Sequence, residues 1–158
     1  MFNSLQKTIS KTIEFKGIGL HSGLESIIKI IPADENFGIV FKRTDLELNN
    51  IVKANFENVS SAKLCTTIQN KFNVSISTVE HLLAALYITG IDNALIEINA
   101  SEVPIMDGSS KEFVETILEI KTKEQTAKRK YLKILKKFKF KENEKLISIE
   151  PNDKSLNV

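Results

Sequence analysis

The clearest pattern of hydrophobic and polar positions lies in residues 77–86, which read Ser-Thr-Val-Glu-His-Leu-Leu-Ala-Ala-Leu. Apolar residues recur there with the spacing of one face of an α-helix. They are Val79, Leu82, Leu83 and Leu86. Ser77 or Thr78 is the expected N-cap, and Gly90 is the expected C-terminal stop. The pattern therefore predicts a helix over this stretch.

The opposite face of this helix lacks the long charged side chains of a solvated surface. At about 100° per residue, Glu80, His81, Ala84 and Ala85 fall together, opposite the leucines. One acid, one imidazole and two methyl groups allow another group to approach closely. We therefore expect both faces of the helix to be covered.

Alternation of apolar and polar residues predicts strands in the rest of the first 100 residues. The expected strands lie at residues 8–15, 25–31, 38–43, 64–69, 74–77 and 92–99. Residues 64–69 and 74–77 flank a polar turn and should form a hairpin that leads into the helix. The glycine-rich stretch 17–23 permits a bend or a close backbone approach. It is not a dinucleotide-binding motif, because Ser22 replaces the third glycine.

A second helix is expected after a loop at residues 100–108. Ser109 and Glu112 have the spacing of a capping box at its start. Its expected buried stripe consists of Phe113, Val114, Ile117, Leu118 and Ile120.

The pattern changes beyond residue 120. Residues 121–130 are polar and basic without interleaved aromatics, which favours a solvated linker over a nucleic-acid patch. Residues 131–140 and 146–150 alternate and predict a hairpin, which is marginal in water by itself. We therefore expect a first α+β domain at residues 1–122, a linker at 123–130, and the start of a truncated second domain at 131–158.

Composition indicates a folded chain without a strong electrostatic field. The 158 residues are 42% hydrophobic and carry a net charge of +2, so neither a nucleic-acid partner nor a membrane span is expected. Cys65 is the one cysteine, which excludes an internal disulfide and fits a reducing, cytoplasmic compartment.

The Glu–His pair at the start of the first helix can mark a metal ligand beside a carboxylate base. The pattern H-E-x-x-H fails because the order is reversed and Ala85 follows, and H-x-x-E-H fails because Ser77 takes the first position. Spacing alone favours an ordinary hydrogen-bonded histidine at His81, and likewise at His21 in its glycine-rich loop. Cys65 fits a small residue beside a pocket better than a reactive thiol.

Six short stretches nevertheless occur together in a characteristic order. They are residues 17–23 (GIGLHSG), 41–45 (FKRTD), 64–66 (LCT), 77–86 (STVEHLLAAL), 90–93 (GIDN) and 104–109 (PIMDGS). In this order they resemble the bacterial UDP-3-O-acyl-N-acetylglucosamine deacetylases, the zinc-dependent hydrolases of lipid A biosynthesis. The resemblance covers the chain from residue 17 to residue 109, and the C-terminal hairpin also fits.

The resemblance implies two similar α+β domains, each a sheet with two helices packed on one face, that meet around the active site. It implies that Zn²⁺ is the cofactor, that His81 is a zinc ligand, and that Glu80 is the general base that takes a proton from the attacking water. The implied substrate is UDP-3-O-acyl-N-acetylglucosamine, which loses its N-acetyl group. The residues assigned to the substrate pocket from the resemblance are Leu64, Cys65, Thr66 and His21.

One departure from the family limits what this chain can do. The family's other zinc ligands lie in its second domain in an H-K-x-x-D arrangement, which this sequence lacks. A catalytic zinc site uses about three protein ligands, whereas the histidines here are His21 and His81. We therefore interpret the chain as the N-terminal half of the deacetylase, inactive alone, whose helix face is covered by a missing second domain or a partner. The alternative is a non-catalytic remnant domain that binds a partner chain through that face.

Overall fold

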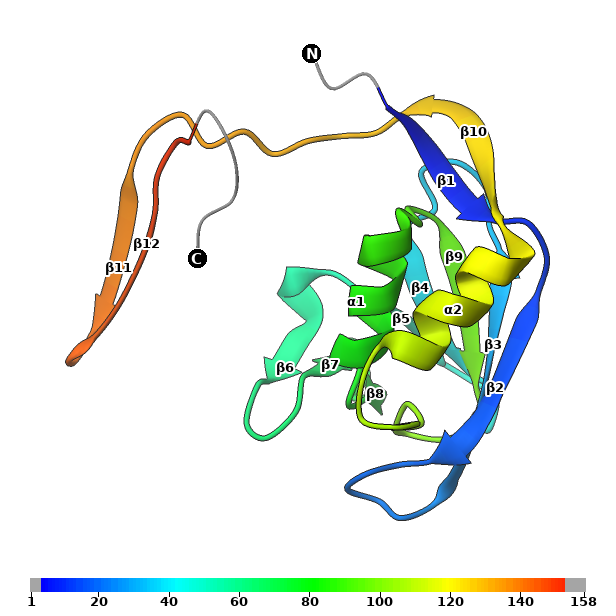
Figure 1. Ribbon diagram of the computed structural model, residues 1–158. Helices are drawn as coiled ribbons and strands as arrows, with labels where there is room; N and C mark the ends of the chain where they lie inside the picture. Colours follow the sequence, from blue (N-terminus) through cyan, green and yellow to red (C-terminus); the bar gives the residue numbers. More distant parts are fainter. Residues whose placement is uncertain (1–3, 153–158) are drawn as a thin grey trace.

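The computed structural model describes residues 4–152, which form strands β1 to β12, helices α1 and α2, and a short 3₁₀ helix η1 (Figure 1). The strands are β1 Leu5–Ile9, β2 Ile13–Ile18, β3 Glu25–Pro32, β4 Ile39–Arg43, β5 Ile51–Lys53, β6 Val59–Ser61, β7 Thr67–Gln69, β8 Ser75–Ile76, β9 Ala94–Ile98, β10 Thr122–Lys128, β11 Phe138–Glu142 and β12 Lys145–Ile149. The helices are α1 Glu80–Thr89, α2 Lys111–Ile120 and η1 Phe56–Asn58.

The main sheet has the strand order β2-β3-β9-β4-β5, with β9 and β4 parallel and the other neighbours antiparallel. Helices α1 and α2 lie side by side on one face of this sheet (Figure 1). A smaller sheet, β6-β7-β8, contains the expected hairpin before α1. These features confirm the predicted α+β fold with two helices on one face.

The core lies between the main sheet and the helices. One buried row crosses all five strands of the main sheet, because its members are paired neighbours. The row is Ile13, Ile30, Ile96, Phe41 and Val52. It contributes to one continuous cluster that also contains the buried sides of α1 and α2.

Both helices differ in detail from the expected faces. Leu82 and Leu86 of α1 are buried as expected, but Ala85 is also fully buried, so it does not share the outer face with Ala84. In α2, Phe113 is buried against Phe15 with ring centroids 4.8 Å apart. Leu118, which we expected in the buried stripe of α2, is 60% exposed. Helix α1 contacts α2, and Ala85 belongs to the same core cluster as the residues of the sheet, so the buried arc of α1 is wider than one leucine stripe.

The capping box expected at the start of α2 is absent. The N-cap is Ser110, whose side chain makes no capping bond, while the Ser109 hydroxyl accepts a hydrogen bond from the Lys111 backbone at 3.1 Å. The Ser109 backbone N–H donates to Asp107 at 2.9 Å, which replaces the reciprocal bond that Glu112 would have made. The aspartate thus takes over the role of the glutamate.

The N-terminal strand and the expected linker also differ from prediction. The chain expected as one strand at residues 8–15 divides into β1 and β2, which belong to different sheets. Strand β1 pairs antiparallel with β10, and β10 occupies most of the segment 123–130 that we expected to be a solvated linker. The residues paired between β1 and β10 lie more than 110 positions apart, so the local sequence pattern does not predict this pairing.

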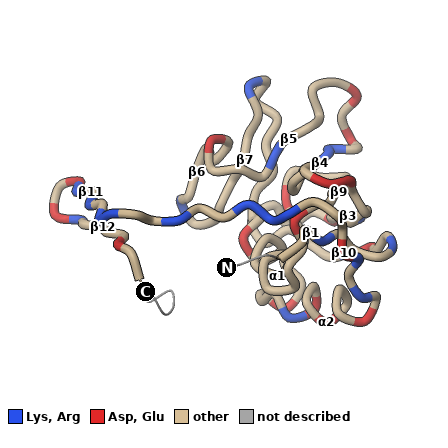
Figure 2. Tube along the Cα trace, turned by 90° about the horizontal axis from the view of Figure 1, so that it is seen from above, with Lys and Arg blue, Asp and Glu red and all other residues tan. Residues whose placement is uncertain are grey.

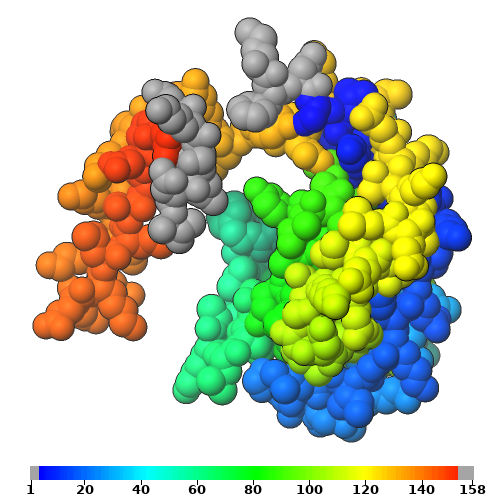
Figure 3. Space-filling view, viewed as in Figure 1, coloured from blue at the N-terminus to red at the C-terminus, as the bar shows by residue number. Residues whose placement is uncertain are grey.

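The C-terminal hairpin forms as predicted, although its first strand starts at Phe138 rather than at residue 131. It stands apart from the rest of the molecule at the end of an extended segment (Figures 1 and 3). That segment, residues 129–137, is rich in Lys and Arg (Figure 2). Every residue of β11 and β12 is exposed. Within residues 4–152, no helix is both long enough and apolar enough to cross a lipid bilayer.

Candidate functional site

The candidate site lies at the N-terminus of α1. Glu80 and His81 are the first two residues of this helix, and both side chains are half-buried. A carboxylate is favoured in the first turn of a helix by the helix dipole. Neither expected N-cap is used, because Val79 occupies that position without a side-chain bond. The C-terminal stop is confirmed, since Gly90 adopts the left-handed conformation.

The structure brings Thr66 against this helix start. The Thr66 backbone N–H donates to Oε2 of Glu80 at 3.1 Å, and the Thr66 carbonyl accepts from the Val79 N–H at 3.4 Å. Among residues 4–152, no donor reaches the other carboxylate oxygen of Glu80, and no hydrogen bond engages the His81 imidazole. The Glu80 carboxylate can therefore accept a proton, and the His81 imidazole can coordinate a metal ion, without breaking an existing hydrogen bond.

The other residues assigned to the substrate pocket lie in a loop, not in the strand that the sequence predicted. Strand β7 starts only at Thr67, so Leu64, Cys65 and Thr66 precede it. Leu64 has a positive φ of 68° and its side chain is 86% exposed. Cys65 is half-buried, with Sγ 3.8 Å from Oγ1 of Thr67. The loop thus exposes the apolar side chain of Leu64 to solvent and contacts the Glu80 carboxylate through the Thr66 backbone.

His21 lies in the exposed turn between β2 and β3, and the structure links it to α1 through a residue that sequence reasoning missed. That residue is Glu102, which accepts a hydrogen bond from the His21 backbone N–H at 3.0 Å. Burial opposes ionisation of Glu102, but hydrogen bonds from His21, Ser22 and Thr78 outweigh it and lower the pKa of its carboxyl to about 2. The signal that could have revealed it is an isolated acid beside the apolar Val103 and Pro104.

The glycine-rich stretch makes the close approach that its composition permits. A Cβ at Gly19 would lie 2.4 Å from Oε2 of Glu102 and 2.2 Å from the Ser22 hydroxyl. A Cβ built on Gly17 would likewise lie 3.0 Å from the Cβ of Pro104. The two glycines let the turn between β2 and β3 close over the loop that carries Glu102.

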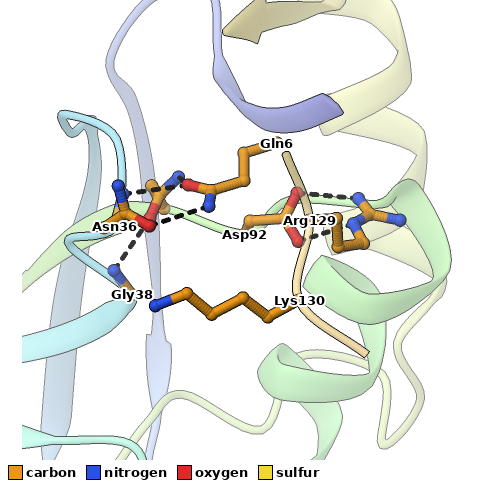
Figure 4. Close-up of a pocket in the computed structure, with 7 residues that line it drawn as sticks. Gln6, Asn36, Gly38, Asp92, Arg129 and Lys130 are labelled. Atoms are coloured by element: carbon orange, nitrogen blue, oxygen red, sulfur yellow. Dashed lines mark hydrogen bonds and ion pairs between the residues drawn. The ribbon is translucent and has the colours of Figure 1, made fainter. Parts of the chain in front are cut away.

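A separate cavity of about 230 Å³ lies near the other end of α1 (Figure 4). Its polar groups bind one another: Arg129 makes two bonds of 2.7 Å to Asp92, and Gln6 donates to Asn36 at 3.0 Å. Asp92 also accepts from the Lys7 backbone at 2.8 Å. This network joins β1 and the end of β10 to the start of β9, which is a structural role for Asp92.

The described residues do not complete a metal centre. Within residues 4–152, no group of three or more His, Cys, Asp or Glu side chains is arranged to hold a metal ion. A catalytic zinc needs about three protein ligands. His81 can supply one nitrogen, so the fit to zinc is partial.

Comparison with known proteins identifies the family of the chain. The chain is 44% identical over 146 residues to the UDP-3-O-acyl-N-acetylglucosamine deacetylase of Shewanella frigidimarina (strain NCIMB 400), and 45% identical over 147 residues to that of Legionella pneumophila (strain Corby). The matches cover 92% and 93% of this chain but 48% of each relative. The chain therefore spans about half the length of the curated relatives it matches. The family model for UDP-3-O-acyl N-acetylglycosamine deacetylase matches residues 6–158, so the chain belongs to this family.

Proposed function

We propose that this chain forms part of a zinc-dependent hydrolase that removes the N-acetyl group from UDP-3-O-acyl-N-acetylglucosamine in lipid A biosynthesis. Family membership and the names of the relatives support this reaction class. The observation that carries the proposal is the Glu80 carboxylate, held at one oxygen by the Thr66 N–H and placed next to His81 at the start of α1. A carboxylate fixed in this way beside a metal ligand is suited to general base catalysis.

Each residue receives a distinct role in this proposal. Glu80 takes a proton from the attacking water at Oε1, while the Thr66 N–H keeps the carboxylate in position. His81 supplies one ligand to the zinc. When bound, zinc would act as a Lewis acid toward the amide carbonyl. The loop at Leu64, Cys65 and Thr66 and the exposed turn at His21 contact the substrate.

The remaining zinc ligands come from outside the described residues. This follows from the ligand count, since these residues supply one imidazole where about three ligands are needed. The relatives are about twice as long as this chain, which leaves room for a second domain that provides the rest. We place the protein in the cytoplasm, where the free thiol of Cys65 would stay reduced. Neither a nucleic acid nor a membrane span is part of the proposal.

A specific observation favours a second candidate, a non-catalytic domain that binds a partner chain. The outer faces of the two neighbouring helices expose large apolar side chains: Tyr87 is 86% and Ile88 is 64% exposed on α1, and Leu118 is 60% exposed on α2. Exposed apolar residues that gather on neighbouring helices mark a contact surface. In this candidate the surface would bind a separate partner chain, whereas in the deacetylase a second domain of the same enzyme would cover it.

The deciding experiment is a deacetylation assay on the full product of the natural gene, with its zinc content measured on the same sample. Turnover that disappears with a chelator and returns with zinc supports the enzyme. A pure, folded gene product that has no turnover at any zinc concentration contradicts it and favours the partner-binding domain.

A further inference from the structure

Glu102 joins two segments that are distant from each other in the sequence. Its partners His21 and Ser22 lie 81 and 80 positions away, and its partner Thr78 lies 24 positions away. Glu102 is 2% exposed, and three protein groups donate hydrogen bonds to its carboxylate. Oε1 accepts from the His21 N–H at 3.0 Å and from the Thr78 hydroxyl at 2.8 Å, and Oε2 accepts from the Ser22 N–H at 2.8 Å. One carboxylate thus holds the turn between β2 and β3 and the residue two positions before α1.

The two segments are residues 21–22 of the turn and Thr78, and the position of Glu102 between them is itself fixed. Its carbonyl accepts a hydrogen bond from the Ser26 hydroxyl at 2.6 Å, and its backbone forms an isolated bridge with Ser77. The glycine at position 19 gives the turn room to reach the carboxylate, because a Cβ there would overlap Oε2. Glu102 therefore contacts strand β3, the turn between β2 and β3, and the residues just before α1.

The bond to Thr78 bears on how α1 begins. Thr78 has a φ of 57°, an uncommon conformation for a β-branched residue. It immediately precedes the N-cap residue Val79, which is followed by Glu80 and His81. A backbone held in this conformation needs support from its surroundings, and the hydroxyl bond to the buried Glu102 provides it. The direction in which the helix leaves Thr78 determines where the Glu–His pair lies.

We propose that Glu102 is a positioning residue. It joins the turn that contains His21 to the residues at the start of α1, and it thereby holds His21 in a fixed position relative to Glu80 and His81. Glu102 acts through its neighbours, since its two oxygens are occupied by three protein donors. Its low pKa keeps it ionised at the pH of any ordinary assay, which excludes a role as a proton donor. The catalytic consequence rests on the proposed deacetylase function, whereas the link between turn and helix does not.

The link is tested first by hydrogen exchange on the 158-residue chain. Glu102→Gln keeps the shape of the side chain but replaces one acceptor oxygen with an NH₂ group that faces an N–H donor. We expect the His21 and Ser22 amides to exchange about ten- to a hundredfold faster, the factor that corresponds to losing a hydrogen bond to a charged group. Asp107→Asn, an exposed acid in the same loop, is the matched control and should leave both amides unchanged. Unchanged exchange in Glu102→Gln overturns the proposal.

A second variant decides the question if Glu102→Gln does not fold. Thr78→Val leaves the carboxylate in place and removes only the hydroxyl that joins it to the helix. Faster exchange of the His21 amide in this variant supports the link, and exchange equal to that of the wild type overturns it. Thr78→Ser keeps the hydroxyl and should restore wild-type exchange.

The catalytic consequence is tested on the full gene product, with rates normalised to the folded fraction. We expect Glu102→Gln and Thr78→Val to lower kcat by about ten- to a hundredfold with KM within about threefold, since small displacements of reacting groups have effects of this size. Thr78→Ser should recover most of kcat. Wild-type kcat in Glu102→Gln would overturn the positioning role while the deacetylase proposal stands. A wild-type protein without deacetylase activity would instead overturn the proposed function, and hydrogen exchange would still decide whether Glu102 links turn and helix.

Discussion

At the scale of single residues, the first turn of α1 combines a carboxylate that is restrained with an imidazole that is accessible. The Thr66 N–H restrains Glu80 from one side, and the imidazole of the following His81 makes no hydrogen bond within residues 4–152. A general base gains from such restraint, because a fixed carboxylate loses less entropy when it meets its proton donor. The two roles that we propose, general base and zinc ligand, therefore fall on two adjacent side chains that differ in their hydrogen bonding.

Replacing the proposed base should separate metal binding from turnover. We expect Glu80→Gln in the full gene product to retain zinc and to lose about two to four orders of magnitude in kcat, the range for removal of a positioned general base. Metal analysis and steady-state kinetics on the same preparation measure both quantities. A near-normal rate with zinc bound would remove Glu80 from the mechanism.

The buried carboxyl of Glu102 should make stability depend on acid pH. Its pKa is lowered from 4.5 to about 2 in the folded chain, so its contribution is present above pH 4.5 and is lost as the pH falls toward 2. The contribution is at most about 3 kcal/mol, from the size of the shift. Urea unfolding of the wild type and Glu102→Gln between pH 6 and pH 3 measures it. The wild type should lose more stability than the variant over this range, and parallel losses would contradict the assignment.

At the scale of the element, α2 shows how one helix divides its residues between core and surface. Phe113 and Ile117 are fully buried against the sheet and α1, whereas Leu118 points away from them. The outer side of α1 is similar, with Tyr87 and Ile88 exposed. Each helix therefore has a core side that stabilises the domain and an outer apolar side that does not.

Two truncations in α2 should have very different effects. Phe113→Ala removes a buried ring that packs on Phe15 and should lower the free energy of unfolding by about 3–5 kcal/mol. Leu118→Ala, one turn further along on the outer side, should change it by less than about 0.5 kcal/mol. Urea denaturation of both variants at one protein concentration gives the comparison. Equal effects would mean that the outer side of α2 is also part of the core.

The outer helix surface should promote self-association of the 158-residue chain. Tyr87 and Ile88 on α1 and Leu118 on α2 each expose apolar surface, which is unfavourable in water. We expect the apparent mass in sedimentation to rise with protein concentration, and the double variant Tyr87→Lys with Ile88→Lys to remain monomeric at the same concentrations. A wild-type chain that stays monomeric and binds no hydrophobic dye would contradict a covered helix surface.

At the scale of the whole molecule, the chain combines one packed unit with an exposed C-terminal hairpin. The main sheet, both helices and the β1–β10 pair surround the core, while β11 and β12 have no buried residue. A two-stranded hairpin is marginal in water unless it packs against something else. The hairpin and the outer sides of the two helices are thus the parts of the described molecule that expose apolar side chains without contributing to the core.

The ligand count predicts how these 158 residues behave alone. We expect weak zinc binding and no deacetylation, because His81 provides one ligand and the described residues hold no cluster of three. Equilibrium dialysis against zinc, with a deacetylation assay on the same sample, tests both expectations. Stoichiometric, tight zinc with turnover would show that this chain has ligands that we have not identified.

The sequence by itself determined the features that depend on local periodicity. Strand β9 lies within the strand expected at residues 92–99, and its alternation buries Ala94, Ile96 and Ile98. Helix α1 spans the stretch whose apolar residues recur at helical spacing. The left-handed Gly90 ends α1 where a glycine was expected to end it. Steric and hydrophobic preferences of this kind act over a few residues, so the order of residues along the chain contains them in full.

Only the tertiary structure decided the features that join distant residues. The pairing of β1 with β10, the burial of Ala85 and the link from Glu102 to His21 each depend on elements that meet only after folding. Thr78 at positive φ is a further example, because its conformation is supported by a side chain 24 residues away. Such contacts are selected by the packing of the whole core and by the need to satisfy a buried charge, and neither condition is visible in a short window of sequence.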